Sequence, residues 1–173
     1  MFSIINDTYF TTFTCNSWIS VLDLAGCKEV TLNTFEYLHN NNIATIYAFV
    51  IMPNHVHVIW AVKEKEIKYL KAAFTSVTAH KMLQMIKQIN PEFLNKITST
   101  QTDRKYQFWE RRSYWKSVPS ENIFIQKLKY IHLNPVRKRW TLAPSPEEYE
   151  WSSAKSYYEG KSLFEFLTLF HFN

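Results

Sequence analysis

The 173-residue chain has little cysteine, little glycine and no long apolar run. Its two cysteines, Cys15 and Cys27, lack metal-ligand spacing, which favours a reduced, cytosolic protein. No apolar run approaches the ~20 residues that a membrane helix needs. Charged residues make up only 20% of the chain and hydrophobic residues 46%, a balance typical of a globular rather than a disordered protein. Without internal repeats or a domain boundary, we expect one domain over residues 1–173, with 141–173 as a C-terminal extension.

Aromatic residues and positive charge are what the chain has in abundance. Aromatics account for 17% of the residues and the net charge is +5. Because Trp and Tyr are also favoured on binding surfaces, we expect some rings to do more than fill a core. The charge suits a polyanionic partner without naming one.

The order of predicted elements indicates an α+β sandwich, an antiparallel sheet with helices packed on one face. Aromatic and β-branched runs predict strands, and apolar residues three and four apart predict helices. Ser120 fits a helix N-cap and Pro135 ends that helix. We expect strands at 9–15, 44–51, 55–62 and 104–116, and helices at 22–40, 67–88, 121–134, 151–158 and 163–172.

Two histidines follow a turn in the predicted hairpin. Pro53 and Asn54 supply the turn, and the second strand begins His55-Val56-His57. Alternate side chains of a strand share a face, so both imidazoles point the same way and Val56 points the opposite way. Such a pair makes half of a metal site. The alternative is a pair of half-exposed strand residues without a ligand.

A second candidate group lies on the helix at 121–134. Tyr130 and Asn134 are four residues apart and therefore share one helix face. They are either a functional phenol with a nearby amide, or a core tyrosine followed by a helix-ending cap. Lys127, three residues before Tyr130, is a candidate for lowering the phenol pKa or an ordinary surface lysine.

Cations and aromatic rings interleave from Arg104 to Lys116, and a further basic cluster follows Val136. Cations neutralise phosphates and flat rings stack on bases, which is how unpaired nucleic acid is held. The alternative is a strand with rings inside and cations outside. The predicted DNA contacts are Arg104, Lys105, Tyr106, Phe108, Trp109, Arg111, Arg112, Arg137, Lys138 and Arg139.

Together, Met52-Pro53-Asn54-His55-Val56-His57 and Tyr130-Ile131-His132-Leu133-Asn134-Pro135-Val136-Arg137 resemble the signature of the REP-associated tyrosine transposases. These belong to the single-tyrosine HUH transposase superfamily. The resemblance extends to the strand at 9–13, to Tyr106–Glu110 and to Pro146–Ala154. It implies a ferredoxin-like fold with the HUH motif on a central strand.

The resemblance also implies a chemistry. His55 and His57 are expected to bind a metal and Tyr130 to be the nucleophile. Asn134 is expected to complete or support the metal site, where insertion-sequence relatives use glutamine. The expected ion is Mg²⁺ or Mn²⁺, although imidazole suits Mn²⁺ better.

The implied activity is nicking and rejoining of single-stranded, hairpin-forming repeat or transposon-end DNA through a 5′-phosphotyrosine. The implied protein is a monomer or homodimer without membrane contact, in the cytoplasm at the nucleoid. Two alternatives stay open: a non-catalytic hairpin-binding protein of the same ancestry, and a metal hydrolase in which Tyr130 has no role. The covalent scheme requires the helix carrying Tyr130 to pack across the sheet, close to His55 and His57.

Overall fold

The computed structural model describes residues 7–100 and 102–171. One strand, a helix, a hairpin and a second helix build the first half of the chain, and a third long helix follows the last strand. The strands and α-helices are β1 (Thr8–Thr14), α1 (Cys27–Asn40), β2 (Thr45–Ile51), β3 (His55–Ala61), α2 (Ile67–Ile89), β4 (Tyr114–Ser117), α3 (Glu121–Leu133) and α4 (Ala154–Glu159). Short 3-10 turns are η1 (Asn16–Trp18), η2 (Val21–Asp23), η3 (Glu64–Glu66), η4 (Pro91–Ile97) and η5 (Pro146–Glu148).

The four strands form one antiparallel sheet in the order β2-β3-β1-β4. From β1 to β4 the elements run βαββαβ, the order expected for a ferredoxin-like core. The predicted α+β class and antiparallel sheet are therefore confirmed. His55-Val56-His57 opens β3, an inner strand, and β3 pairs with β2 across the predicted Pro-Asn turn.

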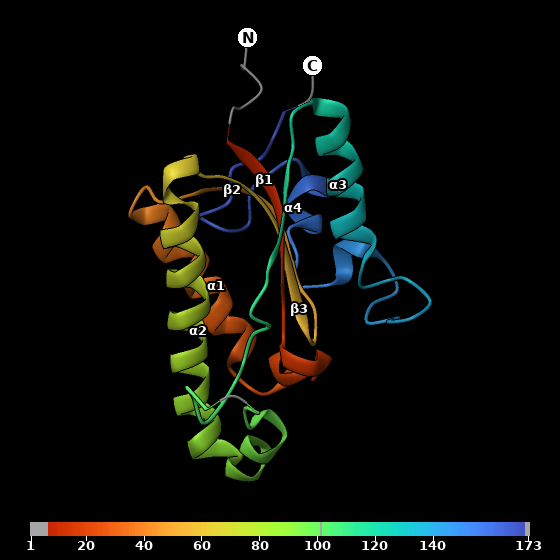
Figure 1. Ribbon diagram of the computed structural model, residues 1–173. Helices are drawn as coiled ribbons and strands as arrows, with labels where there is room; N and C mark the ends of the chain where they lie inside the picture. Colours follow the sequence, from red (N-terminus) through yellow and green to blue (C-terminus); the bar gives the residue numbers. More distant parts are fainter. Residues whose placement is uncertain (1–6, 101, 172–173) are drawn as a thin grey trace.

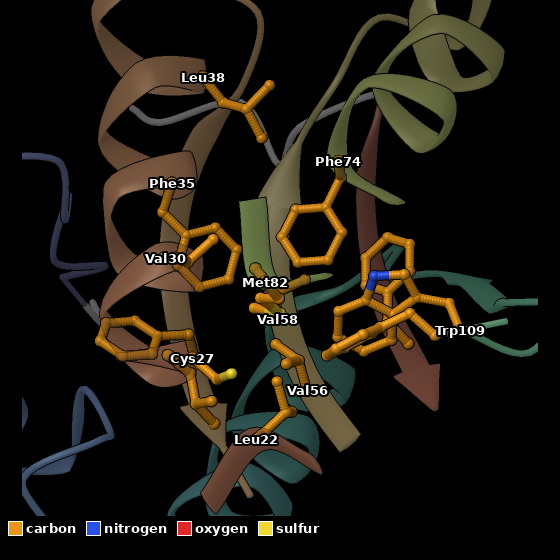
Figure 2. Packing of buried hydrophobic residues seen from close by; sticks show 14 of the residues in the cluster. Leu22, Cys27, Val30, Phe35, Leu38, Val56, Val58, Phe74, Met82 and Trp109 are labelled. Atoms are coloured by element: carbon orange, nitrogen blue, oxygen red, sulfur yellow. The ribbon is translucent and has the colours of Figure 1, made fainter. Parts of the chain in front are cut away.

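Helices cover both faces of this sheet (Figure 1). Val56, Val58 and Trp60 of β3 belong to the larger core, which also contains buried residues of α1 and α2. Figure 2 shows Phe35 of α1 and Phe74 of α2 in this core, with Trp109 beside them.

The prediction that the helices pack on one face holds for α1 and α2 and is wrong for α3. Phe124, Leu128 and Ile131, at turn-by-turn spacing on α3, join a second core with Phe10 and Ile59 on the opposite face. The physical reason is that Ala48, Val50 and Ile59 of β2 and β3 present apolar side chains on this face as well, so both faces require cover.

The stretch 104–116 is mostly irregular, and only Tyr114–Ser117 forms a strand. Phe108 and Trp109 are buried, and the Trp109 indole N–H donates a hydrogen bond to Thr78 Oγ1 at 2.8 Å. Neither ring offers a free face to a base, which corrects the prediction for these two residues. Burial of their apolar area in the α1/α2 core outweighs the pairing that a regular strand would gain.

The predicted helix at 163–172 is also wrong over the described part, 163–171, which forms no helix. Phe166 and Leu167 are buried, and Leu167 makes an isolated parallel bridge with Ile46 of β2. Ser152 makes a second bridge, to Val50. The C-terminal extension therefore covers the free edge of β2 with backbone hydrogen bonds that a helix could not provide.

Candidate active site

The pleat of β3 directs His55 and His57 towards α3. Side chains alternate along a strand, so Val56 enters the α1/α2 core while both histidines lie on the other face. Their ring centroids are 4.6 Å apart, and both residues are buried. A pair of adjacent, buried imidazoles is thus fixed by the strand itself.

Helix α3 brings Tyr130 to this pair. The helix begins at Ser120, whose Oγ accepts a hydrogen bond from the Ile123 N–H, and it docks through the apolar face described above. The Tyr130 ring then lies 5.1 Å from the His57 ring, centroid to centroid. Asn134, directly after the helix, is buried beside them. The four residues predicted from the two motifs therefore converge, all from one chain.

A cavity of about 160 Å³ is lined by these four residues. One hydroxyl, two indoles and two guanidinium groups complete its wall, from Thr12, Trp18, Trp140, Arg137 and Arg139. The described part of this wall carries no carboxylate, so its charge is positive.

Hydrogen bonds orient both imidazoles. The Asn54 Nδ2 donates to the Trp18 carbonyl at 2.9 Å, which leaves Asn54 Oδ1 facing His55 Nδ1 at 2.7 Å. His55 Nδ1 therefore carries the proton, and its Nε2 keeps a lone pair. His57 Nδ1 is 2.8 Å from Thr12 Oγ1, while its Nε2 is buried without a hydrogen-bond partner.

Both imidazoles are held neutral. Burial, with a smaller contribution from Arg139, lowers the pKa of His55 to about 4. Burial, assisted by His55, Arg137 and Lys127, places the pKa of His57 well below its usual value. The neutral imidazole is the form that binds metal ions.

The donor set fits a divalent ion. A buried ring nitrogen without a partner, a second neutral imidazole and the amide of Asn134 face one small cavity. Mixed nitrogen and oxygen donors suit Mn²⁺ better than Mg²⁺. Within residues 7–100 and 102–171, no group of three or more His, Cys, Asp or Glu could hold a metal. Ligands beyond these three side chains would have to come from water or substrate.

Cations surround the phenol. The Arg137 guanidinium carbon lies 4.5 Å from the centre of the Tyr130 ring, and Lys127 Nζ lies 5.8 Å from it. Lys127 Nζ also lies 4.7 Å from the centre of the Phe10 ring. Burial and the nearby Lys116 lower the pKa of Lys127. The Lys127 side chain is half-buried.

The predicted DNA contacts fall into two groups. Arg137 and Arg139 line the cavity, and Lys138 is exposed between them. Most of the other group lines a separate hollow of about 540 Å³ beside α2, where Arg104 and Arg111 pair with Asp103 at 2.7 and 3.4 Å. Lys105 and Arg112 lie outside its lining. In this second group Tyr106 is half-buried, and the exposed cations are Arg104, Lys105, Arg111 and Arg112.

Sequence reasoning missed Trp18, Trp140, Thr12 and Asn54. Asn54 directly precedes His55, so its position could have suggested a supporting role. Thr12 faces His57 only through the β1–β3 register. Trp140 directly follows Arg139 at the end of the predicted basic cluster, whereas Trp18 reaches the cavity from a distant segment and no local pattern marks it.

Comparison with known proteins points to one class of fold. No protein-family model matches the chain, and no curated protein sequence does. The structure of a REP-associated tyrosine transposase bound to a REP hairpin matches with a TM-score of 0.66 and 14% identity. The match covers all of this chain and 93% of that one.

A protein of Deinococcus radiodurans R1, described as a candidate transposase, matches with a TM-score of 0.48 and 18% identity, over 72% of this chain and 87% of that one. The first likeness carries the comparison. The likeness to the REP-associated tyrosine transposase, at 14% identity, establishes the fold. At the level of the fold, it confirms the resemblance seen in the sequence. Among the described residues, no helix has the length and apolar character needed to cross a membrane.

Proposed function

We propose that this protein is a metal-dependent, single-strand DNA endonuclease and strand transferase, with Tyr130 as the nucleophile. The proposed substrate is hairpin-forming repeat or transposon-end DNA. One observation carries the proposal: the Tyr130 ring lies 5.1 Å from His57, whose buried Nε2 has no partner. The full-length likeness to a transposase bound to a REP hairpin supports it.

Tyr130 would attack a DNA phosphorus through its phenolic oxygen. A tyrosine hydroxyl ordinarily keeps its proton at neutral pH, so attack requires stabilisation of the developing phenolate. Lys127 and Arg137, next to the ring, supply that positive charge. One O–P bond forms to tyrosine, whose phenolic proton passes to solvent, and one breaks to the 3′ oxygen, which takes up a proton from solvent. The resulting 3′ hydroxyl can reverse the step, so rejoining requires no external energy.

His55, His57 and Asn134 would hold the divalent ion, whose contribution when bound is Lewis-acid stabilisation of charge on the phosphate. Arg137 and Arg139, which line the cavity, would bind neighbouring phosphates. All of these groups belong to one chain, so the scheme needs no helix exchanged between copies. Monomer or homodimer, and a location at the nucleoid, stay predictions.

The decisive experiment replaces the nucleophile. Labelled single-stranded hairpin DNA is incubated with the protein and Mn²⁺, and covalent adducts are resolved on a denaturing gel. We expect an adduct with the parent protein and none with Tyr130→Phe, which keeps the ring packed on Phe10 and His57. Tyr158→Phe, at an exposed tyrosine on α4, is the matched control and should retain the adduct.

Other results distinguish the alternatives. Cleavage without an adduct, unchanged in Tyr130→Phe, would support a metal hydrolase. Tight hairpin binding without cleavage would support a non-catalytic binding protein.

A separate prediction concerns the role of the Lys127 ammonium beside the Tyr130 phenol. Lys127→Met removes the ammonium beside the phenol while keeping an apolar side chain of similar length. We expect adduct formation to slow by about tenfold and its pH profile to move to higher pH, because the phenolate loses a nearby charge. Lys129→Met, at an exposed lysine of the same helix, is the control. An unchanged rate and an unchanged pH profile in Lys127→Met would exclude this role.

A further inference from the structure

Trp18 is an exposed indole at the edge of the proposed catalytic cavity. It lines the cavity, and its ring centroid lies 5.9 Å from that of the buried His55. Yet 54% of the residue is accessible to solvent. A large apolar ring left open beside a buried polar site offers contact area to a ligand.

The backbone of Trp18 is held in an uncommon conformation. Ser17 and Trp18 have φ values of +55° and +58°, which bulky L-residues rarely adopt. Hydrogen bonds at each step fix this turn: the Ser17 N–H donates to Glu110 Oε1 at 2.9 Å, and the Trp18 N–H to the Cys15 carbonyl at 3.0 Å. The Trp18 carbonyl accepts the Asn54 amide that also orients His55. The turn therefore presents the indole at the cavity while the main chain is anchored independently of the ring.

Arg139 lies between two indoles at this edge. Its guanidinium carbon is 5.9 Å from the centre of the Trp18 ring and 5.4 Å from that of Trp140. The centroid of the Trp140 ring also lies 5.9 Å from that of the His55 ring. Flat rings beside a planar cation are the combination that holds unpaired bases and their phosphates.

We propose that Trp18 and Arg139 form a stacking site for one unpaired base of the DNA strand that enters the cavity. The inference deepens the proposed function and rests on it. The Trp18 and His55 rings are neighbours. If the phosphate of a nucleotide lies at the histidines, the base of that nucleotide or of the next one is therefore within reach of Trp18. A paired base has both faces covered within its duplex, so the site takes single-stranded DNA.

The test is a binding cycle between protein and DNA. Fluorescence anisotropy is measured in EDTA with a hairpin oligonucleotide that carries unpaired flanks of mixed sequence, and with versions lacking the base at successive flank positions. We expect the parent to bind about tenfold more weakly when one particular base is absent. Trp18→Ala should bind the intact oligonucleotide about tenfold more weakly than the parent does. Removing the base at that position should cause no further loss of affinity in this variant. Trp18→Phe should recover most of the affinity.

Tyr69→Ala, at an exposed tyrosine of α2, is the matched control and should bind like the parent. The proposal would be overturned if Trp18→Ala bound the intact oligonucleotide as tightly as the parent does. It would also be overturned if removing the base weakened binding by Trp18→Ala as much as it weakens binding by the parent.

A second measurement needs no alanine variant. Ultraviolet crosslinking of the parent to the intact oligonucleotide should label the peptide containing Trp18, and labelling confined to other peptides would refute the stacking site. Because EDTA prevents the metal-dependent reaction, these results stand apart from the adduct assay. If the binding cycle shows stacking and the adduct assay shows no adduct, only the catalytic proposal is contradicted. If an adduct forms and the binding cycle shows no stacking, only this inference is contradicted.

Discussion

Asn54 is the residue that connects the two parts of the site. Its side chain is buried, donates to the Trp18 carbonyl and accepts from His55 Nδ1, so one amide fixes a turn and an imidazole tautomer together. A ligand histidine depends on such a partner for its orientation and basicity. Asn54 is therefore expected to act through His55 as a positioning residue.

Replacing Asn54 by alanine should weaken Mn²⁺ binding by about 10–100-fold, the usual cost of losing a partner of a ligand histidine. Calorimetric titration with Mn²⁺ in the absence of DNA measures the change directly. Asn41→Ala, at an exposed asparagine after α1, is the control and should leave Mn²⁺ affinity unchanged. Parent-like Mn²⁺ affinity in Asn54→Ala would show that His55 is oriented by other contacts.

At the scale of elements, α3 uses each of its faces differently. One face packs on the sheet, Tyr130 and the following Asn134 face the cavity, and His132 contacts the start of α4. His132 Nε2 is 2.9 Å from Ser153 Oγ, which also hydrogen-bonds with the backbone of Phe49 in β2. His132 does not line the cavity. It joins α3, α4 and β2.

The buried environment of His132 predicts how stability depends on pH. Burial lowers the pKa of His132 to about 4, below the value of about 6.5 in an unfolded chain. Between those values the unfolded chain binds more protons, so stability is highest above pH 6.5 and falls as the pH drops towards 4. His132→Gln removes one such group and should reduce this loss by about 1–3 kcal/mol. His55 and His57 contribute losses of the same sign in both proteins.

Urea unfolding at a series of pH values measures this effect. His80→Gln, at an exposed histidine of α2, is the matched control and should follow the parent profile. If His132→Gln loses as much stability as the parent between pH 6.5 and 4, burial of His132 does not disfavour its protonation in the folded state.

The same scale shows why some elements were predictable. The β2–β3 hairpin, α2 and α3 have strong apolar periods with clear ends, so local pattern sufficed. The segment from Arg104 to Ser113 carries an equally aromatic pattern. Its rings nevertheless insert into the α1/α2 core, where burial decided its irregular path. For the residues 163–171, the free edge of β2 decided the conformation.

At the scale of the whole molecule, the sheet separates the larger hydrophobic core from the candidate active site. Helices α1 and α2 lie on one face of the sheet and α3 on the other (Figure 1). Residues of α1 and α2 close the larger core, while residues of β3 and α3 line the positively charged cavity. Of the predicted basic residues, Arg137 and Arg139 line this cavity, and Arg104 and Arg111 line the hollow beside α2. The cations that line the candidate active site are therefore two of those that follow α3.

The sequence by itself determined the α+β class, the hairpin, and the facing of His55 and His57, because strand alternation and apolar spacing are local properties. It also placed Tyr130 and Asn134 on one helix face. Only the tertiary structure decided that α3 covers the face opposite α1 and α2, and hence that the phenol reaches the imidazoles. It alone brought Trp18 and Trp140 to the same cavity, because contacts between residues far apart in the chain depend on how complete elements pack, and no local spacing encodes that.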